Sequence, residues 1–190
     1  MIEPRRYVSR GGDKLNAALE AFQLDPAGWT CADLGSHVGG FVDCLLRRGA
    51  ARAYSVDTSY GTLAWTLRRD PRVVVLERTN AMHIRLPEPA DLVTIDVGWT
   101  RQEAILPNTM ALLKPGGFVV TLIKPHYEAA ASELEQGVVV PDKFEGVVER
   151  VLHQIRSGGW RVVRTVDSPI PGHGGNVELF ACLQRRETQP

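Results

Sequence analysis

The sequence predicts an α/β fold with a mostly parallel sheet and helices on both faces. Short apolar runs alternate along the chain with amphipathic helical segments, which is the pattern that βαβ units produce. The last two apolar runs are joined only by residues 167–176. That segment is too short for a crossover helix, so we expect these two strands to pair antiparallel. The predicted sheet has seven strands, with one antiparallel strand near its edge.

The elements follow from where the apolar pattern starts and stops. Residues 127–140 fit a surface loop or a broken helix. We expect helices at 12–23, 41–48, 59–68, 100–113 and 142–156. We expect strands at 29–34, 53–56, 72–76, 91–95, 118–123, 160–166 and 177–183.

The first two helices are marked by side-chain spacing and by a stop signal. Leu15, Leu19 and Phe22 share one face of the first helix, as an amphipathic segment requires. Gly49 follows the second helix, at the position where a left-handed glycine is favoured.

The later helices are marked by possible N-caps. Ser59 can cap the third helix, and Asp70-Pro71 ends it. Thr100 and Asp142 are each followed three residues later by glutamate, which has the form of a capping box. Gly158-Gly159 ends the last helix.

Length and charge bound the class of protein. The 190 residues fit one domain spanning positions 1–190. Lys and Arg number 22, and so do Asp and Glu, so the formal net charge is zero. This balance excludes a strongly cationic nucleic-acid coat protein and an acidic disordered tail, but a local basic patch can still bind nucleic acid.

Other features favour a cytoplasmic protein without a membrane or metal partner. The apolar runs are too short to span a bilayer, and the start has no signal-peptide pattern. Cys31, Cys44 and Cys182 form no CxxC pair, so we expect buried thiols in a reduced compartment. The histidines lack metal-ligand spacing, so we predict no metal.

Polar residues converge on one edge of the predicted sheet. Ligands of open parallel sheets bind beyond the carboxyl ends of the strands. Because the last strand runs the other way, its start lies at the same edge. The residues placed there are Asp33, Gly35, Asp57, Asp96, Lys124, Asn176 and Glu178.

The loop from Gly35 to Gly40 suggests a nucleoside-containing cofactor. It joins a strand to a helix, and Asp57 ends the next strand, where a carboxylate can accept hydrogen bonds from ribose hydroxyls. The glycines follow G-x-x-x-G-G, so neither the dinucleotide fingerprint G-x-G-x-x-G nor the Walker pattern is present. The alternative is that these glycines only make a tight strand-to-helix turn.

Ordered sequence blocks over residues 7–184 resemble a known family. They are Tyr7-Val-Ser-Arg-Gly-Gly-Asp-Lys14-Leu, Asp33-Leu-Gly-Ser-His-Val-Gly-Gly-Phe41, Glu77-Arg-Thr-Asn80, Ile95-Asp96-Val97, Ile123-Lys124-Pro125-His-Tyr-Glu128 and Gly175-Asn176-Val-Glu178. In this order they are similar to FtsJ-like RNA methyltransferases, in particular the haemolysin-A-like branch. The resemblance implies a Rossmann-like S-adenosylmethionine-dependent methyltransferase fold in a single domain.

The resemblance also implies a reaction and its catalytic residues. The family transfers a methyl group from S-adenosylmethionine to a ribose 2′-hydroxyl of RNA, and rRNA is the expected substrate. Its Lys-Asp-Lys-Glu tetrad matches Lys14, Asp96, Lys124 and Glu178. Lys124 is then the candidate general base, which burial and a second cation such as Lys14 would favour by lowering its pKa.

A set of cofactor-binding residues is expected around the same edge. Asp57 should take the ribose hydroxyls, and Asn80 and Ala81 should meet the adenine. His37 either contacts the cofactor or is a polar loop residue. The full predicted set is Asp33, Gly35, Ser36, His37, Gly39, Gly40, Phe41, Asp57, Thr58, Asn80, Ala81 and Asp96.

The chain departs from the branch's pattern in several places. Ser36-His37-Val38 replaces Ala-Ser-Thr, Val97-Gly98-Trp99 replaces Val-Ser-Phe, and His126-Tyr127 replaces Gln-Phe. The branch normally carries a small RNA-binding domain ahead of the catalytic block, and this sequence starts just before that block. RNA binding is then expected from the catalytic surface, from a partner, or not at all.

Two points stay open on the sequence alone. Arg5, Arg6 and Arg10 cluster near the first block, where they either contact RNA phosphates or form a solvated face. The alternatives to an RNA methyltransferase are a methyltransferase for a non-RNA substrate and a non-catalytic module that binds S-adenosylmethionine or RNA.

Overall fold

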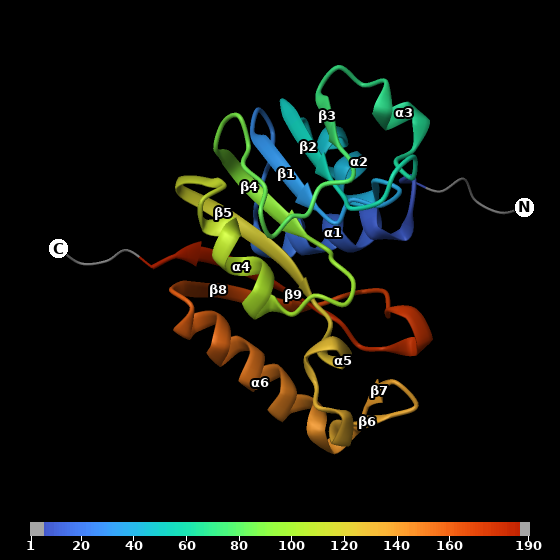
Figure 1. Cartoon of the computed structure of the whole chain (residues 1–190), viewed down its shortest axis with the longest axis vertical. Coiled ribbons are helices and arrows are strands. Elements are labelled where there is room, and N and C mark those ends of the chain that lie inside the picture. The colour runs from blue at the N-terminus through green and yellow to red at the C-terminus, as the bar shows by residue number, and fades with distance from the viewer. Residues whose placement is uncertain (1–5, 187–190) are drawn as a thin grey trace, which may run out of the picture.

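A seven-stranded sheet forms the centre of the molecule, as predicted (Figure 1). The computed structural model describes residues 6–186, apart from the side chain of His173. The strand order is β3-β2-β1-β4-β5-β9-β8. Strands β1 to β5 pair in parallel, and β9 pairs antiparallel with both β5 and β8. The strands are β1 (Thr30–Leu34), β2 (Arg52–Val56), β3 (Val73–Leu76), β4 (Ala90–Ile95), β5 (Leu113–Ile123), β8 (Trp160–Asp167) and β9 (Leu179–Arg185).

Helices cover both faces of this sheet. Figure 1 shows α1 on the far side of the sheet and α4 on the near side, with α6 beside β8. A small hairpin of β6 (Leu134–Glu135) and β7 (Val138–Val139) stands apart from the main sheet. The helices are α1 (Arg10–Phe22), α2 (Gly40–Arg47), α3 (Trp65–Arg68), α4 (Gln102–Met110), α5 (Pro125–Glu128) and α6 (Pro141–Ser157), with short 3₁₀ turns at Ala131–Glu133 and His173–Gly175.

Two apolar layers result from the alternation of side chains along the strands. Cys31, Leu92 and Val120 pack with α1 and α2 on one face. The neighbouring residues Ala32 and Val93 pack with α4 and α6 on the other. Because the central strands are buried on both faces, they consist of nearly continuous apolar runs.

Gly49 ends α2 as expected. Its φ is +87°, and its N–H donates to the carbonyl of Leu46 at 3.1 Å while Ala50 N–H donates to Leu45 O at 3.0 Å. This pair of bonds is the Schellman arrangement, which a left-handed glycine allows.

The predicted N-caps are wrong. The residue before α3 is Ala64, and α3 has only four residues, so residues 59–64 form turns in place of the expected helix. The residue before α4 is Arg101, and Thr100 Oγ1 donates to the Gly98 carbonyl at 3.2 Å. Asp142 lies inside α6, which begins at a proline. In each case a backbone turn starts the helix without a side-chain hydrogen bond at its cap.

Two further boundaries differ from expectation. β5 begins at Leu113 and not at the expected residue 118, because Leu113 pairs with Ala90 before the register shifts at Leu92. Residues 114–117 therefore lie within an irregular strand. The segment 127–140 contains the end of α5, a 3₁₀ turn and the β6–β7 hairpin, whose apolar side chains pack with α6.

Candidate active site

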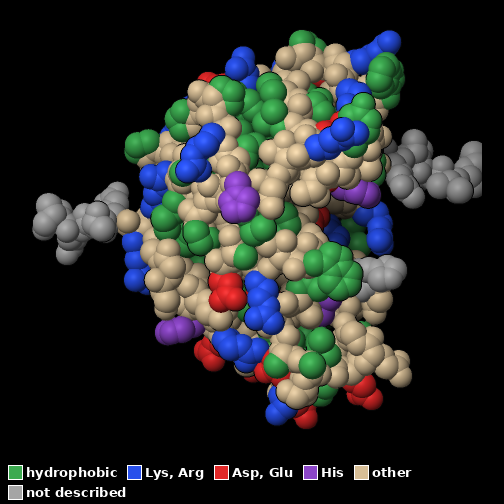
Figure 2. Space-filling view, in the orientation of Figure 1, with side chains coloured by type: hydrophobic (Ala, Val, Ile, Leu, Met, Phe, Trp, Pro, Cys, Tyr) green, Lys and Arg blue, Asp and Glu red, His purple; other side chains and the backbone are tan. Residues whose placement is uncertain are grey.

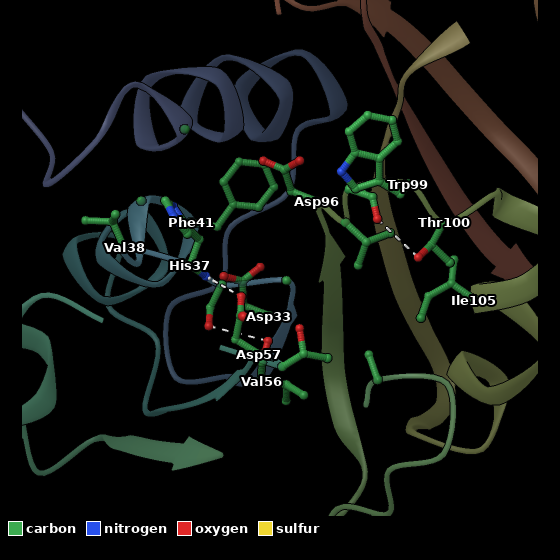
Figure 3. Close-up of a pocket in the computed structure, with 18 of the residues that line it drawn as sticks. Asp33, His37, Val38, Phe41, Val56, Asp57, Asp96, Trp99, Thr100 and Ile105 are labelled. Atoms are coloured by element: carbon green, nitrogen blue, oxygen red, sulfur yellow. Dashed lines mark hydrogen bonds between the residues drawn. The ribbon is translucent and has the colours of Figure 1, made fainter. Parts of the chain in front are cut away.

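A cleft of about 580 Å³ lies beyond the carboxyl ends of the parallel strands. In the sheet, β1 lies between β2 and β4, so the connections after β1 and after β4 run to opposite sides. The cleft opens at this switch point, where such sheets bind ligands. Figure 3 shows His37 and Val38 on one side of the cleft and Trp99 and Thr100 on the opposite side. The predicted site residues that line it are Lys14, Asp33, Gly35, Ser36, His37, Gly40, Phe41, Asp57, Thr58, Asn80, Ala81, Asp96 and Lys124.

Lys124 and Asp96 form an ion pair inside the cleft. Lys124 Nζ lies 2.6 Å from Asp96 Oδ1, and it also donates to the Val97 carbonyl at 3.2 Å. The two residues follow β5 and β4, which are neighbours in the sheet. Their side chains are partly exposed to the cleft, so a substrate can reach both.

Lys14 and Glu178 form the second ion pair. Lys14 Nζ lies 2.5 Å from Glu178 Oε2. Lys14 comes from α1 and lines the cleft, whereas Glu178 precedes β9, is 4% exposed and does not line it. The main chain approaches closely at Gly172, where a Cβ would lie 2.1 Å from Glu178 Oε1. Glu178 therefore contacts the lining of the cleft through Lys14.

The carboxylate of Asp57 is fixed by backbone donors. His37 N–H donates to Asp57 Oδ2 and Ser59 N–H donates to Asp57 Oδ1, both at 2.7 Å. Burial raises the pKa of Asp57, but the hydrogen bonds from Ser59 and His37 outweigh it, so the pKa lies below its usual value. An ionised carboxylate with spare lone pairs can accept bonds from a ligand's hydroxyls.

The glycine loop brings the end of β1 close to the end of β4. Gly35 has φ +89°, and a Cβ there would lie 2.4 Å from the Asp96 carbonyl oxygen, so only glycine fits. Gly39 also has a positive φ, of +98°, but a Cβ there would meet Leu67 at 2.4 Å. Gly39 faces α3 and does not line the cleft. The loop glycines thus make the tight turn after β1. They also let the loop pack closely against the Asp96 backbone and against Leu67.

Asp33 is a buried carboxyl group with one unpaired oxygen. It is 1% exposed. Thr94 Oγ1 donates to its Oδ1 at 2.8 Å, and its Oδ2 has no hydrogen-bond partner among the described residues. Burial raises the pKa of Asp33 to about 8, and the negative charges of Asp96 and Asp57 add to the effect. An orphaned oxygen and neighbouring carboxylates fit a cationic ligand such as a sulfonium.

Trp99 is a highly exposed aromatic side chain of the lining. It is 88% exposed, with φ +60°. Its ring centroid lies 5.1 Å from that of Tyr127, and Lys124 Nζ lies 5.7 Å from the Tyr127 centroid. The aromatic pair therefore stands beside the Lys124–Asp96 ion pair.

Several lining residues were outside the predicted set. Gly98 and Trp99 had a signal, since they lie just after Asp96 and depart from the branch's pattern. Ile105 comes from the start of α4 and carries no signal in the sequence. The remaining additions are Ser9, Gly11, Val38, Val56, Thr79, Met82, Val97 and Thr100.

The arginines predicted to bind RNA are not placed together. Arg10 lines the cleft. Arg6 lies over the ring of Tyr7, 5.1 Å from its centroid, in a separate hollow of about 400 Å³ that Arg47 and Arg48 also line. Arg5 lies outside the described residues.

Neither a metal-ligand cluster nor a membrane-spanning helix is present within residues 6–186. No three His, Cys, Asp or Glu side chains in this range lie together as metal ligands would. No helix in this range combines the length and apolar character needed to cross a membrane. The three thiols are free and buried, and burial raises the pKa of each.

The fold and the cleft define an S-adenosylmethionine-dependent methyltransferase. Solved structures of this class share the fold: fibrillarin from Aeropyrum pernix, described with natively bound S-adenosyl-L-methionine, matches with a TM-score of 0.64 at 20% identity, covering 90% of this chain and 73% of that one. Within this class the chain belongs to the FtsJ-like methyltransferase family, whose profile matches residues 7–185.

Individual relatives support the assignment to this family. The 16S/23S rRNA (cytidine-2′-O)-methyltransferase TlyA of Mycobacterium tuberculosis is 42% identical over 186 residues, which are 95% of this chain and 69% of TlyA. Hemolysin A of Brachyspira hyodysenteriae is 34% identical over 187 residues, 95% of this chain and 78% of that protein. A Streptococcus thermophilus structure named as a hemolysin candidate matches with a TM-score of 0.94 at 35% identity, covering 99% and 70% of the two chains.

Proposed function

We propose that the chain transfers a methyl group from S-adenosylmethionine to a ribose 2′-hydroxyl of RNA, with rRNA as the substrate. The observation that carries this proposal is the ion pair of Lys124 and Asp96, 2.6 Å apart, in the cofactor cleft. The name of the relative TlyA, an rRNA cytidine-2′-O-methyltransferase, supports the same substrate.

The chemistry requires a base at the position of Lys124. A ribose hydroxyl is a poor nucleophile until its proton is removed, and holding it in line with the methyl donor supplies much of the rate. Lys124 Nζ is the group that accepts this proton, since a general base must lie within hydrogen-bond reach of the hydroxyl it deprotonates. Asp96 orients Lys124 through their short contact.

Lys14 and Glu178 position the ribose. Lys14 Nζ donates to Glu178, which fixes the ammonium group at the cleft wall. An ammonium has three donors, so Lys14 can bind a substrate hydroxyl while it stays paired. We propose that these two residues hold the ribose and leave the proton transfer to Lys124.

The predicted cofactor residues surround the rest of the cleft. When bound there, S-adenosylmethionine supplies an electrophilic methyl group. We propose that Asp57 binds the ribose hydroxyls of the cofactor and that Asn80 and Ala81 meet its adenine. Asp33 and the turn at Gly35 would face its cationic end.

The geometry favours an enzyme over a non-catalytic module. All four side chains of the tetrad are paired two by two, and three of them line the cleft. A scaffold that only binds the cofactor has no need of Lys124 beside Asp96. Because rRNA is the proposed substrate, we propose that the protein acts in the cytoplasm. We also propose that the reaction needs no metal ion.

The deciding experiment compares ribose methylation in RNA with and without this protein. Mass mapping of rRNA from cells that carry or lack the gene should show one or more 2′-O-methyl groups that depend on it. A Lys124→Ala protein should not restore them. The matched control is Lys114→Ala, which removes the lysine paired with Asp91 at the opposite end of β4. Identical methylation patterns in all strains would contradict the proposal.

A further inference from the structure

A surface beside the cleft combines exposed aromatic rings with arginines. Tyr60 and Trp65 are 70% and 63% exposed. Arg78 lies over the ring of Tyr60, 4.3 Å from its centroid, and Arg69 lies over the ring of Trp65 at 4.8 Å. We call these four residues the α3 surface. Figure 2 shows hydrophobic and basic side chains side by side at upper right, over the position of α3 in Figure 1.

The arginines of this surface are not neutralised by acids. The nearby Glu77 is paired with Arg68, and Asp70 is paired with Arg72 at 2.7 Å. Neither Arg69 nor Arg78 is a member of any ion pair formed within residues 6–186. The α3 surface therefore presents positive charge on aromatic rings.

The backbone of this surface is held together by one half-buried carboxylate. Glu77, after β3, accepts hydrogen bonds from Gly61 N–H at 2.8 Å and from the Arg68 guanidinium. Arg78 N–H donates to the Ser59 carbonyl at 3.1 Å. These bonds join the loop that carries Tyr60, the helix that carries Trp65 and the segment that carries Arg78. A ligand would thus find the rings already arranged, which lowers the entropy cost of binding.

The α3 surface lies at the rim of the cleft. Thr58, two positions before Tyr60, and Thr79, next to Arg78, both line the cleft. An RNA strand that places one ribose at Lys124 must continue past the rim in both directions. The α3 surface is available to the nucleotides on one of these sides.

We propose that the α3 surface binds unpaired nucleotides that flank the methylated nucleotide in the RNA substrate. Exposed aromatic rings stack on single-stranded bases, and arginines contact phosphates and stack on bases. A duplex hides its base faces, so a ring surface of this kind favours single strands. The inference rests on the proposed function for its choice of RNA.

Binding measurements test the surface without methyl transfer. The variants are Tyr60→Ala/Trp65→Ala and Arg69→Ala/Arg78→Ala. The control is Arg156→Ala/Val163→Ala, which removes an exposed arginine and an exposed apolar side chain from α6 and β8. The affinity for a labelled oligouridine should fall about tenfold or more in the aromatic variant. The arginine variant should bind more weakly and with a smaller salt dependence, and the control should stay within about twofold of wild type.

Steady-state methylation of rRNA gives the second test. The aromatic variant should raise the KM for RNA about tenfold and leave kcat and the affinity for S-adenosylmethionine unchanged. Unchanged oligouridine affinity in that variant would overturn the inference, as would tighter binding of a duplex than of oligouridine. Displacement of oligouridine by polyglutamate at equal charge concentration would assign the surface to an acidic protein and overturn it too. The wild-type protein could bind oligouridine and yet fail to methylate RNA. If the aromatic variant then lost oligouridine binding, the result would support the α3 surface and refute the proposed function.

Discussion

Asp96 and Lys124 meet because the strands before them are paired in register. Ile95 of β4 lies opposite Thr121 of β5, so the two chains leave the sheet together and Lys124 Nζ comes within 2.6 Å of Asp96 Oδ1. At the opposite end of the same strands, Lys114 Nζ lies 2.8 Å from Asp91 Oδ2. The structure thus offers two similar ion pairs, of which one borders the cleft.

Replacement of Lys124 should separate chemistry from binding. Lys124→Ala should reduce methyl transfer by about 10² or more, as expected for loss of a general base. Cofactor affinity and the unfolding midpoint should change little, because the side chain is partly exposed. Lys124→Arg should not restore activity, because a guanidinium stays protonated. Initial rates on rRNA check this against Lys114→Ala. Near-normal turnover in the Arg variant would show that the residue supplies only positive charge.

Replacement of Asp57 should weaken cofactor binding. The carboxylate accepts backbone bonds from His37 and Ser59 and lines the cleft. Asp57→Ala should lower the affinity for S-adenosylmethionine by about 1–3 kcal/mol, the effect of leaving buried polar groups without a partner. Titration calorimetry measures the change. An affinity equal to that of wild type would remove Asp57 from the cofactor site.

Cofactor affinity should rise with pH through the ionisation of Asp33. Burial raises the pKa of Asp33 to about 8 in the folded, cofactor-free protein, so the carboxyl is largely protonated at pH 7. A cationic ligand favours the ionised form, so binding should release a proton and strengthen as pH rises from about 6 to 8. Calorimetry in two buffers with different ionisation enthalpies measures the proton released. Equal apparent enthalpies in both buffers would contradict the prediction.

Two variants distinguish the contribution of Asp33 to the pH dependence of binding from that of the other carboxylates in the cleft. Asp33→Asn keeps the shape of the group but should abolish proton release and flatten the pH profile. Asp57→Asn is the matched control, because the pKa of Asp57 is lowered and this group is already ionised over that range. It should weaken binding without changing the slope.

Ionisation of Asp33 should also make the folded protein less stable as the pH rises. An aspartate in the unfolded chain ionises near a pKa of about 3.9, well below the folded value for Asp33 of about 8. The folded protein therefore holds the extra proton between these values, and stability that is present at low pH is lost as pH rises toward 8. The unfolding midpoint of Asp33→Asn should exceed that of wild type by more at pH 8 than at pH 5.

The Lys14–Glu178 pair should be replaceable for stability but not for activity. Both side chains are largely buried, so Glu178→Ala, which leaves an unpaired cation, should lower the free energy of unfolding by about 3–5 kcal/mol. Lys14→Met/Glu178→Met should recover most of this loss. Urea unfolding measures the stability, and methylation assays should find the double variant inactive. An active double variant would show that the pair is only structural.

The fold was largely predictable because the spacing of apolar residues in the sequence shows which strands and helix faces are buried. The central strands are buried on both faces, so each has a nearly continuous apolar run in the sequence. The segment between β8 and β9 was too short for a crossover helix. Helix starts were less predictable. Capping-box spacing at Thr100 and Asp142 suggested side-chain caps, but backbone turns and Pro141 begin these helices.

The site was predictable to the extent that strand ends specify it. Asp57, Asp96 and Lys124 follow strands, so the shared sheet edge was enough to bring them together. Glu178 was placed at this edge by the direction of the last strand, whereas Lys14 came in chiefly through the family resemblance. Their pairing was not predicted, because no local pattern relates a helix to a strand that distant in the sequence. The exposure of Trp99 depends on a left-handed backbone at a tryptophan, which no sequence rule indicates.

The Lys14–Glu178 contact has a consequence for how this protein comes to be made. It joins the first helix to the residue just before the last strand, 164 positions later, and that strand is inserted between β5 and β8. A nascent chain therefore cannot form this contact until Glu178 has left the ribosome. A premature stop codon that removed β9 would leave β8 without its neighbour and Lys14 without its anion. The contact is thus acquired only after every strand from β1 to β8 has been synthesised.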